Sequence, residues 1–67
     1  MEPNYLVLLD FSKGQIFKIR LTEDEKVLAR TFNDFESFLP IMEDKYSFKT
    51  SHCTWMICEK LEEKVYN

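Results

Sequence analysis

Two apolar runs flank the only glycine of the chain, and they constrain the fold more than any other feature. Residues 4–21 read NYLVLLDFSKGQIFKIRL, with Gly14 between the two runs. Glycine enters the left-handed backbone region at no steric cost, so a glycine between two runs of this kind is typical of a β-hairpin turn. The sequence therefore predicts a β-hairpin over residues 4–21.

The register of this hairpin can be predicted because a shift of one residue moves every side chain to the other face. A two-residue loop would place Leu9 opposite Lys18. A three-residue loop, with Gly14 in a G1 bulge, pairs Leu9 with Phe17 instead. We adopt the three-residue loop because it gathers apolar residues on one face, the expected core face. These residues are Tyr5, Val7, Leu9, Phe11, Phe17, Ile19 and Leu21.

The opposite face of the hairpin then carries three residues from each strand. They are Leu6, Leu8, Asp10, Ile16, Lys18 and Arg20. The first strand is apolar on both faces, which is typical of a central strand. The second strand carries the two basic residues, and charges of this kind protect an edge strand from aggregation.

Two helices are predicted after the hairpin. The segment TEDE, from Thr22 to Glu25, matches a capping box, and apolar residues then recur at steps of three and four. One straight helix over residues 23–46 would be about 36 Å long. That length exceeds a seven-residue strand, which spans about 23 Å. Asn33-Asp34 resembles a second helix start, so we predict helices over 23–31 and 34–46, the second with Pro40 as an irregularity.

A third strand is predicted over residues 53–59, which makes the chain a single small α+β domain over residues 1–67. The expected architecture is ββααβ, a three-stranded sheet in the order 2-1-3 with both helices on one face. If the helices pair up and down, the third strand lies parallel to the first. Both faces of this strand are apolar, and we expect the Trp55 face to point into the core.

The composition excludes several classes of protein. The apolar fraction is 45% and the net charge is −3, from 9 basic and 12 acidic residues. This is the composition of a globular domain rather than a disordered chain. A negative net charge disfavours non-specific binding to nucleic acid. The first residues show neither a signal peptide nor a membrane span, so we expect a cytoplasmic protein with reduced thiols.

The segment HCTWMIC, residues 52–58, is where metal, redox or nucleophilic chemistry would be expected. It contains both cysteines, the only histidine and the only tryptophan. Cys53 and Cys58 are five residues apart, so on a strand they point to opposite faces and cannot share a zinc ion or form a disulfide. His52 and Cys53 likewise diverge, which disfavours a nucleophile and base pair. We therefore predict no enzyme, no catalytic residue, no metal and no cofactor.

An interaction module is the function that remains. Apolar residues on the uncovered sheet face, rimmed by charges, would mark an interface with a protein partner or with a second copy of the chain. The expected interface residues are Leu6, Leu8, Asp10, Ile16, Lys18, Arg20 and Met56.

Two alternatives to this interface stay open. In the first, the tail LEEKVYN folds back and covers this face with Leu61, Val65 and Tyr66. In the second, the domain binds nucleic acid weakly through Lys18, Arg20 and an exposed aromatic residue such as Trp55.

The chain as a whole resembles short uncharacterised bacterial proteins of the kind found in gut Bacteroides. The resemblance rests on an apolar first strand followed by IFKIRLTEDE, NDFESFL and a late CTWM. It spans most of the chain, and it implies a bacterial cytoplasmic origin without implying an activity.

Overall fold

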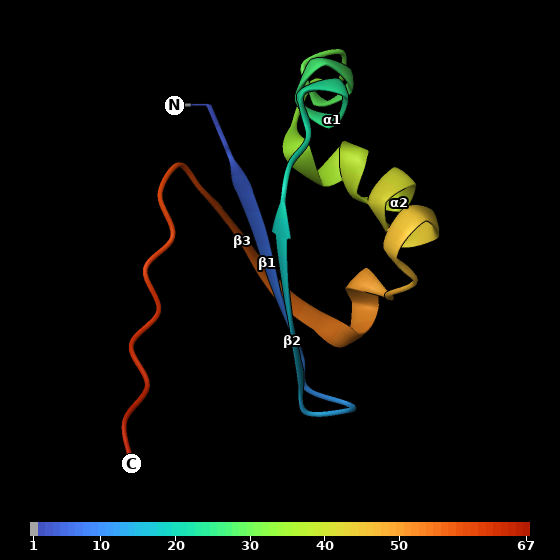
Figure 1. The fold of residues 1–67 in the computed structure, drawn as a ribbon. Helices are drawn as coiled ribbons and strands as arrows, with labels where there is room; N and C mark the ends of the chain where they lie inside the picture. Colours follow the sequence, from blue (N-terminus) through green and yellow to red (C-terminus); the bar gives the residue numbers. More distant parts are fainter. Residues whose placement is uncertain (1) are drawn as a thin grey trace.

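The structure is a computed structural model that describes residues 2–67. Its elements are β1 (Tyr5–Asp10), β2 (Gln15–Arg20), α1 (Glu23–Ala29), α2 (Phe35–Tyr46), a single 3-10 turn (Thr50–His52) and β3 (Cys53–Cys58). The strands form one sheet in the order β2-β1-β3. Both helices lie on one face of this sheet, while the C-terminal tail runs along the other side (Figure 1). The predicted α+β class, element order and strand order are confirmed.

The predicted register of the hairpin is wrong by one residue. Leu8 pairs with Phe17 and Leu6 with Ile19, where the sequence predicted Leu9 and Val7 in these places. The turn has four residues, 11–14, instead of three. Because side chains alternate along a strand, this shift reverses the two faces of β1. Leu6 and Leu8 are fully buried in the core.

The side chain of Asp10 accounts for the longer turn. Its Oδ1 accepts hydrogen bonds from the Ser12 amide at 2.9 Å, the Ser12 hydroxyl at 2.6 Å and the Lys13 amide at 3.2 Å. These bonds replace backbone pairing over the first part of the turn. Gly14 then closes the turn at φ +63°, in the left-handed region.

The two helices begin at the predicted caps. The Thr22 hydroxyl accepts a hydrogen bond from the Glu25 amide, and the Glu25 carboxylate accepts one from the Thr22 amide, which completes the capping box. Asp34 caps α2 by accepting from the Ser37 amide at 2.8 Å. The second helix continues through Pro40 to Tyr46. Two helices starting near residues 23 and 34 are therefore confirmed.

The third strand does not lie parallel to the first, the direction expected if the helices paired up and down. Cys53 of β3 lies opposite Asp10, and Cys58 lies opposite Tyr5, so β3 runs antiparallel to β1. After α2 the chain passes through the 3-10 turn and enters β3 at the hairpin end of the sheet (Figure 1).

The core lies between the sheet and α2. Leu6 and Leu8 of β1 pack there with Phe38, Leu39 and Met42 of α2, and these five are the largest fully buried side chains. From β3, Trp55 and Ile57 pack against the same cluster. The prediction that the Trp55 face of β3 points into the core is confirmed.

Candidate interaction surface

We call the sheet face that the helices leave uncovered the open face. Alternation along the three paired strands places nine residues on it. They are Tyr5, Val7 and Leu9 of β1, Ile16, Lys18 and Arg20 of β2, and Thr54, Met56 and Cys58 of β3.

Three apolar side chains of the open face are accessible to solvent. Leu9 is 47% exposed, Ile16 61% and Met56 50%. Leu9 and Ile16 lie directly opposite each other across β1 and β2. Val7 is buried between its neighbours Lys18 and Met56, and so connects the pair to Met56. The four residues form an apolar strip across all three strands, in which Leu9, Ile16 and Met56 are exposed and Val7 is buried.

The residues of the predicted interface divide between the two faces of the sheet. Ile16, Lys18, Arg20 and Met56 lie on the open face as expected. Three other predicted members, Leu6, Leu8 and Asp10, lie on the opposite face and are buried. Their assignment followed from the wrong hairpin register. The same error placed Tyr5, Val7 and Leu9 in the core, although they belong to the open face. The Asp10–Phe11–Ser12 sequence, with its potential to form an Asx turn, was the signal that could have corrected it.

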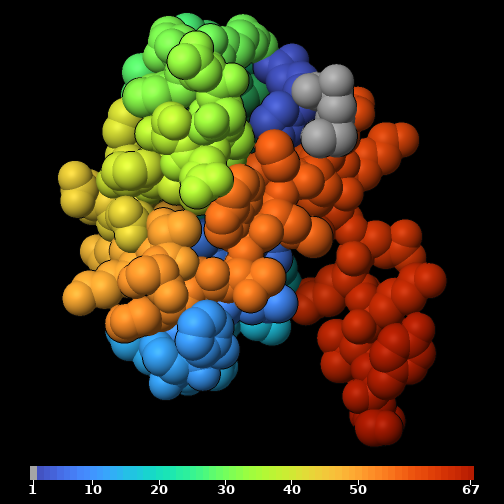
Figure 2. Space-filling model, turned by 180° about the vertical axis from the view of Figure 1, so that it is seen from behind, coloured from blue at the N-terminus to red at the C-terminus, as the bar shows by residue number. Residues whose placement is uncertain are grey.

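The C-terminal tail, residues 59–67, runs beside the open face and leaves Leu9, Ile16 and Met56 accessible to solvent. It is held at its start by a hydrogen bond from the Asn4 side-chain amide to the Glu59 carbonyl, at 2.9 Å. Further along, Lys18 Nζ contacts Glu63 Oε1 at 2.7 Å. Beyond this ion pair the tail stands clear of the body of the domain (Figure 2).

The tail shields little of its own apolar surface on the open face, in contrast to the alternative in which Leu61, Val65 and Tyr66 cover this face. Val65 and Tyr66 are each 83% exposed. Leu61 is half-buried and is the one member of the predicted covering set that is shielded from solvent. Apolar groups therefore remain exposed both on the tail and on the open face beside it.

Lys18 and Arg20 also bear on the nucleic-acid hypothesis. Both lie on the open face and are exposed. Trp55, the aromatic residue expected to stack with bases, lies on the other face, with its ring centroid 6.0 Å from that of Phe35. Glu63 holds the Lys18 ammonium, where a phosphate would otherwise bind. No observation on the open face favours nucleic acid over protein.

The two cysteines lie on opposite faces of β3, as their spacing predicted. Cys53 points toward the helices and Cys58 toward the open face, and both are free thiols. Burial raises the pKa of the Cys53 thiol, and the nearby Asp10 and Glu43 carboxylates raise it further. Within residues 2–67, no three His, Cys, Asp or Glu side chains gather in a way that could bind a metal ion.

The fold and surface define a small α+β domain with an antiparallel sheet that is covered on one face. None of the helices in the described part of the chain has the length and apolar character needed to cross a membrane. Comparison of the chain with protein-family models, with curated proteins and with solved structures found no match.

Proposed function

We propose that this domain is a non-catalytic interaction module that binds a second copy of itself through the open face. The observation that carries the proposal is the apolar strip formed by Leu9, Ile16, Val7 and Met56, on a face that no helix covers. Exposed apolar side chains that gather on one face of a small domain are typical of an interface.

The total surface of the chain supports the proposal. The accessible surface area is 5149 Å². A compact monomer of 8.1 kDa is expected to expose about 4,500 Å². The excess comes from an extended tail that stands away from the domain (Figure 2). A second copy would bury this tail and the apolar strip together.

Charge favours a second copy over an unrelated partner. The basic residues Lys18 and Arg20 lie along one side of the open face, and the tail beside it carries Glu62 and Glu63. A twofold interface must be complementary to itself, which a surface with both signs of charge satisfies. The Lys18–Glu63 ion pair within one chain supports the same pairing between two chains. Val65 and Tyr66 would then pack on the apolar strip of the other copy.

Sedimentation velocity over a range of protein concentrations tests this proposal. We expect the wild-type domain to dimerise with a dissociation constant in the micromolar range, on the order of 1–100 μM, as is common for small interfaces. Ile16→Asp should abolish dimerisation without loss of stability, because Ile16 is exposed in the single chain. Removal of residues 61–67 should weaken it.

Val27→Asp is the matched control for Ile16→Asp. Val27 lies on α1 and is 56% exposed, so this change adds the same charge at a similarly exposed site on the helical side. It should leave the dimer intact. A wild-type protein that stays monomeric at about 1 mM, or an equal loss of dimer in both variants, would contradict the proposal.

We also propose a cytoplasmic location. Support comes from the two free thiols, which lie on opposite faces of one strand and cannot pair with each other. Fractionation of cells that express the full gene product, with thiol alkylation before lysis, tests this location.

A further inference from the structure

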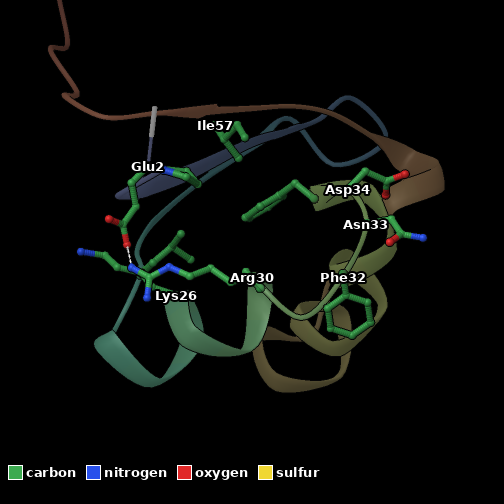
Figure 3. Close-up of a pocket in the computed structure, with 11 residues that line it drawn as sticks. Glu2, Lys26, Arg30, Phe32, Asn33, Asp34 and Ile57 are labelled. Atoms are coloured by element: carbon green, nitrogen blue, oxygen red, sulfur yellow. Dashed lines mark hydrogen bonds and ion pairs between the residues drawn. The ribbon is translucent and has the colours of Figure 1, made fainter.

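A separate cavity lies on the other side of the sheet from the open face. Its volume is about 230 Å³, and it is bounded by α1, the loop between the helices, the segment before β1 and the end of β3 (Figure 3). For comparison, an enclosed apolar cavity of about 150 Å³ holds a benzene molecule. The space therefore suits one aromatic ring with a short substituent.

The floor of the cavity is apolar and is built by the two layers of the fold. Leu21 and Ile57 approach from the sheet, and Ala29 and Phe35 from the helices. Figure 3 shows Ile57 pointing from β3 into this space. A ring placed here would be in contact with aliphatic and aromatic carbon on several sides, which favours burial of an apolar group.

The mouth of the cavity carries a cation that already binds a carboxylate. Arg30, which directly follows α1, and Glu2, in the segment before β1, point toward each other and form an ion pair (Figure 3). Lys26, one helical turn before Arg30, also lines the cavity, and its side chain is only 16% exposed. The Glu2 carboxylate thus occupies a position where the carboxylate of a ligand could bind.

Replacement of the Glu2 carboxylate on Arg30 by the carboxylate of a ligand costs little free energy. The side chains of Arg30 and Glu2 are 59% and 50% exposed, and exposed ion pairs of this kind contribute little to stability. A ligand carboxylate that is attached to a ring would keep the charge pair with Arg30 and add the burial of the ring. Arginine is well suited to this role because its guanidinium binds carboxylates in a planar, two-point geometry.

We propose that this cavity binds a small aromatic carboxylate. The ring lies among Leu21, Phe35 and Ile57, and the carboxylate binds Arg30 in place of Glu2. This site is independent of the open face, because its residues belong to the helical side of the sheet.

Titration of the wild-type protein with phenylacetate, and with its uncharged analogue phenylacetamide, tests the proposal. Trp55 fluorescence is a suitable signal, since its ring lies 6.0 Å from Phe35. Amide chemical shifts should change for Ala29, Arg30 and Ile57. For a ligand of ten heavy atoms we expect a dissociation constant on the order of 0.1–1 mM. The amide should bind at least about fivefold more weakly, because it lacks the charge that pairs with Arg30.

Two variants separate this site from nonspecific binding. Arg30→Gln should reduce the affinity for phenylacetate to that for the amide. Glu2→Gln removes the competing carboxylate and should raise the affinity for phenylacetate severalfold, a gain that a poorly folded protein could not produce. Ile16→Asp, on the open face, should bind phenylacetate as the wild type does.

Three results would overturn the proposal. One is the absence of saturable shifts up to about 20 mM phenylacetate, well above the expected range. Another is equal affinity for the acid and the amide. The third is an unchanged or lower affinity for phenylacetate in Glu2→Gln.

Discussion

Glu25 of α1 accepts a hydrogen bond from the hydroxyl of Tyr46, the last residue of α2, at 2.7 Å. The same carboxylate oxygen accepts a bond from Lys45 Nζ at 2.7 Å, and the other oxygen accepts the Thr22 amide at 2.8 Å. The Glu25 side chain is only 5% exposed. One buried carboxylate therefore caps the first helix and joins it to the end of the second.

Removal of this carboxylate should destabilise the domain more than removal of any one of its partners. We expect Glu25→Ala to lower the free energy of unfolding by about 2–3 kcal/mol, since it leaves the half-buried Tyr46 hydroxyl and the Thr22 amide without acceptors. Tyr46→Phe removes one hydrogen bond and should cost about 1 kcal/mol. Urea unfolding monitored by Trp55 fluorescence measures both values. Equal costs for the two variants would show that Glu25 does not join the helices.

The same carboxylate makes stability depend on pH. Burial acts to raise the pKa of Glu25, but hydrogen bonds from Lys45, the Thr22 amide and Tyr46 outweigh it, so the pKa lies below its usual value. Because the pKa of Glu25 is lower in the folded state, its ionised carboxylate stabilises the fold at pH values above the unfolded pKa of about 4.3. This contribution is lost as the pH falls through the lower folded value.

A comparison of wild type with Glu25→Gln detects this effect. The difference in unfolding free energy should be largest near pH 7 and should shrink as the pH falls below the unfolded pKa of about 4.3 and through the lower pKa of the folded state. Urea titrations at pH 3, 4, 5 and 7 measure it. A difference that does not change with pH would contradict the lowered pKa.

The hairpin register can be tested by mutation of two adjacent leucines. Leu8 is fully buried, whereas Leu9 is 47% exposed. Leu8→Ala should cost about 2–5 kcal/mol, the usual range for a buried leucine. Leu9→Ala should cost less than about 1 kcal/mol, because a half-exposed side chain leaves no enclosed cavity. Urea unfolding of the two variants measures these costs, and the reverse order would support the three-residue loop.

Local signals in the sequence predicted the helices, because the groups that begin them are close together along the chain. Thr22 and Asp34 each bind an amide three residues ahead. The hairpin face depends on a similarly local interaction, the Asx turn in which the Asp10 side chain binds the turn amides, and the apolar pattern of the strands carries no signal of this turn. The direction of β3 had no local signal. It follows from the end of the sheet at which the chain after α2 enters β3.

The candidate interface was predictable only where it lies on β2 and β3. Alternation along β2 placed Ile16, Lys18 and Arg20 on one face, and their position did not depend on the pairing partner. β1 is apolar on both faces, so its pattern could not distinguish Leu8 from Leu9.

Gly14 offers a test of the turn that needs no change in packing. Its φ is +63°, and a Cβ added there would meet nothing within 4 Å. Gly14→Ala should therefore lower stability by about 1 kcal/mol through backbone strain alone. Gly14→Asn should cost about half as much, because asparagine tolerates the left-handed region better. Thermal unfolding of both variants measures the difference. Equal stability of all three proteins would be inconsistent with a left-handed residue 14.

The two thiols should react at different rates in the folded protein. Burial raises the pKa of Cys53, which reduces the fraction of reactive thiolate. We expect Cys58→Ser, which retains only Cys53, to react with a disulfide reagent at pH 8 at least about threefold more slowly than Cys53→Ser. In urea the two variants should react at the same rate, which controls for intrinsic reactivity. Equal rates in the folded proteins would mean that Cys53 is not shielded by the contacts between β3 and the core.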